Sequence, residues 1–260
     1  MNDSKRVNKI KSIVKIASII ELLVAKGEPI RLTDIAKTLK MPKSTACGLV
    51  ATLVDLGYLS KSNETGLYEL GTKLYEIGNA VANKWPEKTL AQPYIMFLVE
   101  KFKETVHMGK LSDGKVLYID KKESSQSIRI VTEPGLKLPA HCTAVGKVLL
   151  AYLPKVELSH ILKNNPLEYY TDNTITNSED FNEELEKIRN QGYATDNQEF
   201  VAGLVCVAAP IFNNRDKVVA ALSVSAPVSR MNPEYMELVK EDLLKSCHEI
   251  STKLGSTLFQ

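Results

Sequence analysis

The sequence predicts a two-domain α+β protein, with an N-terminal winged helix-turn-helix, a linker helix and a C-terminal domain built on an antiparallel sheet. Residues 33–71 have the pattern of two short helices around a tight turn, followed by a hairpin. Downstream, strand and helix patterns mix without regular βαβ alternation, which favours an antiparallel sheet carrying helices. A chain of 260 residues with 44% hydrophobic content is long enough for two cores. We therefore expect domains at 1–71 and 85–260, joined by a linker at 72–84.

The first predicted helix spans residues 9–26 and covers the back of the helix-turn-helix. Gly27 is expected to end it. Its apolar residues recur at helical spacing: Ile10, Ile13, Val14, Ala17, Ile20 and Leu23.

The second helix of the helix-turn-helix has one apolar face and one face of small residues. Its buried stripe is predicted to be Ala46, Leu49, Val50 and Leu53. All residues of the opposite face except Lys43 are small enough to let the helix approach a major groove, and that face comprises Lys43, Ser44, Cys47, Gly48, Ala51 and Thr52. The pattern is that of a recognition helix.

The helix before it and the turn between them follow from local signals. Thr33 is expected to be the N-cap of a helix that buries Ile35, Ala36 and Leu39. The turn then runs from Lys40 to Pro42. Pro42 lies near the first turn of the recognition helix, where the N–H that proline lacks would have no partner within the helix.

The wing follows the recognition helix. Gly57 is expected to stop that helix, a strand begins at Tyr58 and Leu59, and residues 63–66 form the turn before the returning strand. Lys61 lies on this hairpin, where it would face a phosphate backbone.

Charge is distributed unevenly along the chain. Residues 1–84 carry 13 Lys and Arg against 8 Asp and Glu, a net of +5, and residues 85–260 carry 20 against 23, a net of −3, which together give the chain's +2. The basic excess lies on the helix-turn-helix half, as phosphate contacts require. Winged helices also serve as protein-interaction modules, and that alternative stays open because a fold alone does not fix function.

A further amphipathic helix is expected at 72–83, with Leu74, Ile77 and Val81 along one side. This stripe is short, so two alternatives stay open: it pairs with its copy in a second chain, or it packs on its own domain. Trp85 and Pro86 mark the domain boundary.

The C-terminal domain is expected to begin with a helix at 87–104. Strands at 105–111 and 115–121 flank Asp113-Gly114, a strong hairpin signal. Further strands are predicted at 127–132, 204–212 and 217–225, and helices at 143–153 and 178–191.

Several classes of protein are disfavoured. Apolar runs stay short of the roughly 18 residues of a membrane span, and the charged N-terminus lacks the pattern of a signal peptide, so we expect a cytoplasmic protein. The four cysteines are far apart and form no CxxC pair, which argues against a disulfide framework or a structural zinc finger. We expect no cofactor and no metal.

Three features of the C-terminal domain are compatible with a ligand pocket. Strand alternation places Val219, Ala221, Ser223 and Ser225 on one face and Val218, Ala220, Leu222 and Val224 on the core face. The two serines present hydroxyls either to a ligand or to solvent at an edge. Cys206 is either a core residue or a pocket wall. The helix opening at 143–147 offers free N–H groups, which suit a carboxylate.

Nearly the whole chain resembles the IclR family of bacterial transcriptional regulators. Three segments carry the resemblance: the helix-turn-helix with MPKST at 41–45 and its closing YELG at 68–71, PAHCTAVGKVLLA at 139–151, and GYATDNQEFVAGLVCVAAPIF at 192–212 continuing into ALSVSAP at 221–227. The resemblance implies a C-terminal effector-binding domain of GAF-like or PAS-like shape. It also implies an assembly as a homodimer or a dimer of dimers (homotetramer), and repression or activation of nearby operons in response to small organic acids. We expect a repressor.

The same resemblance assigns residues to double-stranded operator DNA and to the effector. For DNA, it points to Lys43, Ser44 and Thr45, with Thr52 and Lys61 as phosphate contacts. Many relatives carry an Arg where this chain has Gly48, so a bidentate guanine contact worth about 1–3 kcal/mol is missing here. For the organic-acid or aromatic-acid effector, the matching positions are Ala144, Val145, Asp196, Glu199, Cys206, Ser223 and Ser225. Asp196 and Glu199 either accept hydrogen bonds from a ligand hydroxyl or amine, or belong to a solvated loop.

The residue types of the C-terminal domain also suggest two rival functions. Ser223, His141 and Asp196 supply the residue types of a catalytic triad, but the chain has no GxSxG elbow and no phosphate-binding loop, so we do not expect an enzyme. The alternative regulator is a metal or redox sensor using His141, Cys142 or Cys206. Adjacent His and Cys side chains diverge and rarely chelate one ion together.

Overall fold

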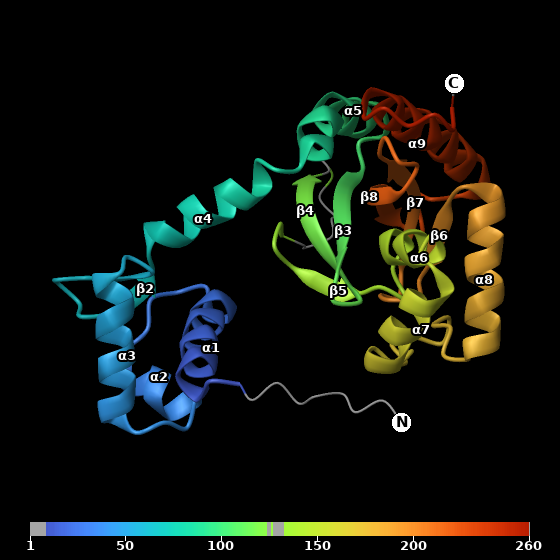
Figure 1. Cartoon of the computed structure of the whole chain (residues 1–260). Coiled ribbons are helices and arrows are strands. Elements are labelled where there is room, and N and C mark those ends of the chain that lie inside the picture. The colour runs from blue at the N-terminus through green and yellow to red at the C-terminus, as the bar shows by residue number, and fades with distance from the viewer. Residues whose placement is uncertain (1–8, 124–125, 127–132, 260) are drawn as a thin grey trace. The chain divides into compact units, whose positions relative to one another are not determined.

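The computed structural model describes residues 9–123, 126 and 133–259. The chain divides into two compact units, one up to Lys84 and one from Trp85 onward (Figure 1). The strand expected at 127–132 lies outside the described residues.

The first unit is a winged helix-turn-helix. Its core contains the stripe predicted for the recognition helix, with Ala46, Val50 and Leu53 buried and Leu49 half-buried. Its elements are α1 (Lys11–Lys26), α2 (Leu32–Thr38), α3 (Lys43–Asp55), β1 (Leu59–Lys61), β2 (Tyr68–Leu70) and α4 (Thr72–Ala82).

The expected cap of α2 is wrong. Helix α2 begins at Leu32, its N-cap is Arg31, and no side chain caps it. Thr33 therefore lies within the first turn, because the chain enters the helix two residues earlier than the capping signal suggests. The wing strand also begins at Leu59, one residue after the predicted start at Tyr58.

Helix α4 forms at the predicted place, and none of its residues is buried. Tyr75 is 73% exposed, and Ile77 and Val81 are more than 40% exposed. Leu74, the third residue of the predicted stripe, is half-buried, so the stripe is exposed at two of its three positions.

Among its described residues, the second unit contains a six-stranded antiparallel sheet of order β5-β4-β3-β8-β7-β6 with helices on both faces (Figure 1). This architecture confirms the α+β prediction. Its strands are β3 (Thr105–Ser112), β4 (Lys115–Lys122), β5 (Lys137–Pro139), β6 (Ala194–Asn197), β7 (Leu204–Phe212) and β8 (Val218–Pro227). Its helices are α5 (Pro86–Phe102), α6 (Ala144–Ala151), α7 (Lys155–Asn164), α8 (Ser178–Gln191) and α9 (Pro233–Lys253).

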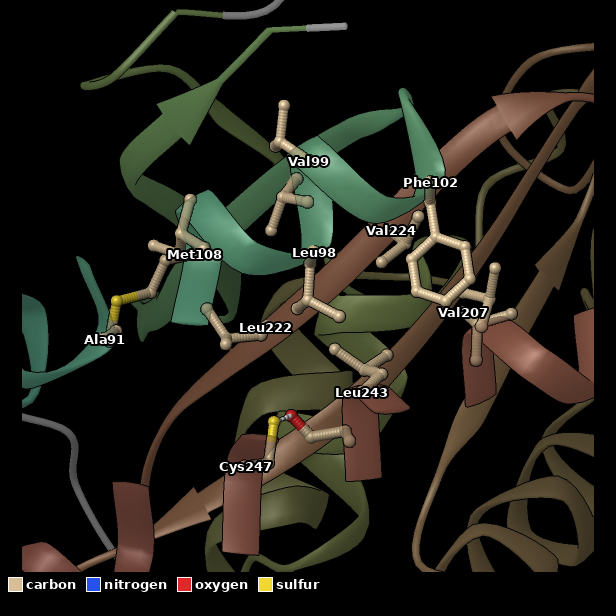
Figure 2. Packing of buried hydrophobic residues seen from close by; sticks show 14 of the residues in the cluster. Ala91, Leu98, Val99, Phe102, Met108, Val207, Leu222, Val224, Leu243 and Cys247 are labelled. Atoms are coloured by element: carbon tan, nitrogen blue, oxygen red, sulfur yellow. Dashed lines mark hydrogen bonds between the residues drawn. The ribbon is translucent and has the colours of Figure 1, made fainter. Parts of the chain in front are cut away.

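One face of the sheet packs against α5 and α9. Figure 2 shows Leu98 and Phe102 of α5 and Leu243 of α9 among Leu222 and Val224 of β8. The Cys247 thiol donates to the carbonyl oxygen of Ala209 on β7 at 3.6 Å. The other face packs against α6, α7 and α8, through residues that include Val148, Leu158, Phe181 and Leu185.

Two local features set the register of the sheet. The β3–β4 hairpin turns at Asp113 and Gly114, which have φ angles of 55° and 78°, as a tight two-residue turn requires. A bulge between β7 and β8 pairs Ile211 with Ala220 and Phe212 with Val218. The faces predicted for Val218 and Val219 are therefore wrong: the bulge turns Val218 toward the α6 side and Val219 toward the α5 side.

Candidate functional site

The outer face of α3 is open along its length. Lys43, Ser44 and Thr52 are exposed, and Thr45 is half-buried. The Thr52 hydroxyl already donates to the Gly48 carbonyl oxygen at 2.9 Å. A Cβ placed on Gly48 would meet nothing within 4 Å, so the recognition helix presents bare backbone at its centre.

The wing contributes an exposed lysine, Lys61, to the surface of the first unit. Lys61 is exposed on β1, and its Nζ lies 5.6 Å from the centre of the Tyr68 ring on β2. The ring restricts the lysine side chain while leaving its charge at the surface.

A cavity of about 120 Å³ lies in the second unit between the sheet and the start of α6. Six of the seven positions expected at an effector site line it: Ala144, Val145, Asp196, Cys206, Ser223 and Ser225. His107, Tyr118, Thr143 and the apolar side chains of Leu136, Leu138, Phe200, Val201 and Leu204 complete the wall.

The start of α6 forms one side of the cavity. The first N–H groups of a helix have no acceptor within the helix, and the helix dipole adds positive potential there. Gly146 allows the helix to approach the segment that follows β5, because a Cβ on it would lie 2.2 Å from the Ala140 carbonyl oxygen. Thr143 precedes the helix, and its hydroxyl donates to the Pro139 carbonyl oxygen at 2.9 Å. This side of the cavity suits an anion.

Asp196 forms part of another wall. It lies in β6, not in a loop, and is only 2% exposed. Burial raises the pKa of its carboxyl from 3.8 to about 7, although Oδ1 accepts the Glu199 backbone N–H at 2.7 Å. A carboxyl with this pKa can donate or accept a hydrogen bond near neutral pH. The solvated-loop alternative is therefore wrong for this residue.

Ser223 and Ser225 point from β8 into the cavity and are 2% and 3% exposed. His107 of β3 lies beside them in the antiparallel register and pairs with Ser223. The Ser225 Oγ and His107 Nδ1 lie 3.4 Å apart. Burial, together with the charge of Lys121, lowers the pKa of His107 to about 3, so this imidazole is neutral.

Sequence reasoning missed His107 and Tyr118. The signal that could have found His107 is the alternation of residues 105–111, which puts it on one strand face, but nothing in the sequence pairs that strand with β8. Tyr118 enters from β4, and burial raises the pKa of its hydroxyl, which stays protonated as a donor.

Glu199, the seventh expected position, is absent from the residues that line the cavity. It is 6% exposed, so the solvated-loop alternative is wrong here too. Its Oε1 lies 2.5 Å from Nζ of Lys147, a lysine buried within α6. Burial raises the pKa of the Glu199 carboxyl, and Lys147 opposes that shift.

The residues of the rival functions are not arranged for those chemistries. His141 lines a separate cavity of about 170 Å³, and its Nε2–H donates to the Glu168 carbonyl oxygen at 2.9 Å, away from Ser223. Burial raises the pKa of the Cys142 thiol to about 12 and that of Cys206 well above its usual value, which disfavours thiolate chemistry. Over the described ranges, no three His, Cys, Asp or Glu side chains gather as metal ligands. In the same ranges, no helix is long and apolar enough to cross a membrane.

Known proteins match both units. The IclR helix-turn-helix domain model matches residues 12–62, and the bacterial transcriptional regulator IclR C-terminal model matches residues 80–252. The chain is 33% identical to the HTH-type transcriptional regulator XynR of Escherichia coli K12 over 246 residues, covering 95% of this chain and 98% of XynR. It is 32% identical to KdgR of the same organism over 251 residues, covering 96% and 95% of the two chains.

The fold matches solved structures as well. The crystal structure of Thermotoga maritima IclR superposes with a TM-score of 0.79 at 33% identity, covering 95% of this chain and 100% of that one. An IclR homologue from Microbacterium hydrocarbonoxydans, solved with 4-hydroxybenzoate, gives a TM-score of 0.82 at 24% identity over 94% and 98% of the chains, a likeness of fold. The chain belongs to the IclR family of bacterial transcriptional regulators, and it is a helix-turn-helix DNA-binding regulator.

Proposed function

We propose that this regulator is a repressor whose affinity for its operator is controlled by a small organic acid bound in the 120 Å³ cavity. In this proposal residues 1–71 bind DNA, residues 72–84 link the units, and residues 85–260 sense the effector in the cytoplasm. Repression is supported by the relative named transcriptional repressor AllR of Salmonella typhi, which is 29% identical over 238 residues.

The observation that supports an organic acid as the effector is the distribution of polar groups around the cavity. The start of α6 favours a carboxylate, while Asp196, Ser223 and Ser225 on the opposite elements supply hydrogen-bonding groups that suit a hydroxyl. Apolar side chains such as Phe200 and Val201 line the rest of the cavity. A small keto, hydroxy or aromatic acid matches this arrangement.

A thermal-shift screen against keto, hydroxy and aromatic acids tests the effector class. We expect at least one acid to raise the melting temperature, since a ligand that binds only the folded state stabilises it. The variant Ser223→Ala/Ser225→Ala should lose most of that response, whereas Ser159→Ala on the exposed face of α7 should keep it. A response that survives in the double variant would contradict the assignment of the two hydroxyls.

For DNA, we propose that Lys43, Ser44 and Thr45 contact the operator at the start of α3, with Thr52 and Lys61 near phosphates. The exposure of the α3 face and of Lys61 supports this assignment. Operator shifts with Lys43→Ala and Ser44→Ala should be weakened, and Lys163→Ala, an exposed lysine of the other unit, should bind as wild type. Undiminished binding in both α3 variants would refute it.

The assembly we propose is a homodimer or a dimer of dimers. The uncovered residues Tyr75, Ile77 and Val81 of α4 support self-association through the linker. Light scattering of the full chain should give a mass of two or four copies, and Tyr75→Glu should reduce it. A monomer at micromolar concentration would contradict the proposal.

A further inference from the structure

Lys147 lies inside the second unit with its side chain only 1% exposed. Its Nζ lies 2.5 Å from Oε1 of Glu199 and 3.0 Å from Oε1 of Glu184 on α8. Burying an ammonium group is strongly unfavourable unless close carboxylates compensate its charge. Two carboxylates do so here, and they belong to segments 37 and 52 residues further along the chain.

The segment that carries Glu199 forms part of the cavity wall. It is the loop 198–203 between β6 and β7, and its residues Phe200 and Val201 line the cavity. The Glu199 backbone N–H donates to Oδ1 of Asp196 at 2.7 Å, so the position of the loop and that of the Asp196 carboxyl are linked.

The backbone of the loop has a second set of contacts, with residues 171–174. The Thr174 hydroxyl donates to the Glu199 carbonyl oxygen at 2.6 Å, and the Thr171 hydroxyl donates to the Gln198 carbonyl oxygen at 2.6 Å. These contacts hold the backbone of the loop, whereas Lys147 holds the Glu199 side chain and ties it to α6. The same helix provides the anion-favouring side of the cavity one turn earlier, at Ala144.

We infer that Lys147 is a positioning residue of the effector cavity: its ion pair with Glu199 holds loop 198–203 against α6 and thereby sets the placement of Asp196 and Phe200. This inference rests on the proposed role of the cavity. Lys147 itself is not among the residues that line the cavity, so it acts through Glu199.

Removing the ammonium group has a defined consequence. Glu199 Oε2 is buried, and within the described residues it accepts no hydrogen bond. Without Lys147, the Glu199 and Glu184 carboxylates face each other with no cation between them, which favours movement of the Glu199 side chain toward water. The Glu199 side chain then no longer ties loop 198–203 to α6, and we expect Cys206, which lines the same cavity as Phe200 and Val201, to become more accessible.

The experiment measures alkylation of Cys206 by iodoacetamide in the ligand-free full chain, resolved by mass spectrometry. Cys247 serves as an internal control, because it is buried in the opposite core between α9 and the sheet. We expect Lys147→Met to accelerate labelling of Cys206 about tenfold or more while Cys247 stays unchanged. Lys187→Met is the matched control, since Lys187 is 66% exposed and lies 4.0 Å from Glu184, and it should label as wild type.

Two results would overturn the inference: an unchanged Cys206 rate in Lys147→Met, or equal acceleration at Cys206 and Cys247, which indicates general loosening. If Lys147→Met does not fold, Glu199→Gln decides, because it weakens the same ion pair without leaving an unpaired carboxylate at position 199. Selective acceleration of Cys206 in Glu199→Gln supports the inference, and no acceleration refutes it. Because labelling uses no effector, failure of the thermal-shift screen would contradict the proposed effector role and leave this result standing.

Discussion

Replacing Asp196 with asparagine isolates the cost of keeping a carboxylate in the cavity wall. Burial raises the pKa of Asp196 from 3.8 to about 7 in the folded protein. Because the folded pKa lies above the unfolded one, the stability contributed by the protonated carboxyl is fully present below about pH 4 and is lost as the pH rises through 7. The full rise in the pKa corresponds to about 4 kcal/mol in the free energy of unfolding. About 3 kcal/mol of this is lost between pH 5 and pH 8.

Asparagine is neutral at every pH and keeps the Oδ1 that accepts the Glu199 N–H. The free energy of unfolding of Asp196→Asn should therefore rise, relative to wild type, by about 3 kcal/mol from pH 5 to pH 8. Urea unfolding followed by fluorescence measures it, since Trp85 is the single tryptophan and packs on the core of the second unit. Asp172→Asn, at an exposed position, is the control and should leave the pH profile unchanged. If the difference in unfolding free energy between Asp196→Asn and wild type stays constant with pH, the raised pKa of Asp196 is refuted.

Three further predictions concern both units. Gly48→Ala should stabilise the first unit by up to about 1 kcal/mol in calorimetry, because α3 gains helix propensity and the new Cβ has free space; a clear loss of stability would contradict it. Gly146→Ala should destabilise the second unit by about 3 kcal/mol or more in urea, because its Cβ would overlap the Ala140 backbone; wild-type stability would contradict the close approach. Lys61→Ala should reduce the slope of log affinity against log salt by about 1 in operator titrations, and an unchanged slope would remove Lys61 from the phosphate contacts.

The elements predicted best from the sequence are those with strong local signals. The stripe of α3, the Asp113-Gly114 hairpin and strand β7 formed where periodicity and turn chemistry placed them. The predictions did not include α7, α9, β5 or β6. For α9 a readable signal existed, since Asn232 caps the helix by accepting the Tyr235 N–H and Pro233 begins it.

Strand β6 could not be predicted for a physical reason. Its sequence, ATDN, has little intrinsic strand preference, and it is extended because it pairs with the buried strand β7. Asp196 therefore looked like a loop residue. The bulge that reversed Val218 and Val219 is likewise set by the pairing of β7 with β8.

The site was predictable only in part. The helix opening at Ala144 and the serines of β8 were visible as local patterns, and the family resemblance grouped them. His107 joined them because β3 pairs with β8 across more than 100 residues of chain. The burial of Lys147 depends on two glutamates from other segments, and a local sequence pattern cannot predict partners that are so far apart in the chain.

The most direct test of the account is operator affinity, measured with and without effector. Fluorescence anisotropy of the full chain on its own upstream DNA should be recorded with the acid that gives the largest thermal shift. For wild type we expect saturating acid to change the affinity about fivefold or more, and for Ser223→Ala/Ser225→Ala we expect little change. Unchanged wild-type affinity at an acid concentration that saturates the thermal shift would contradict a ligand-controlled regulator.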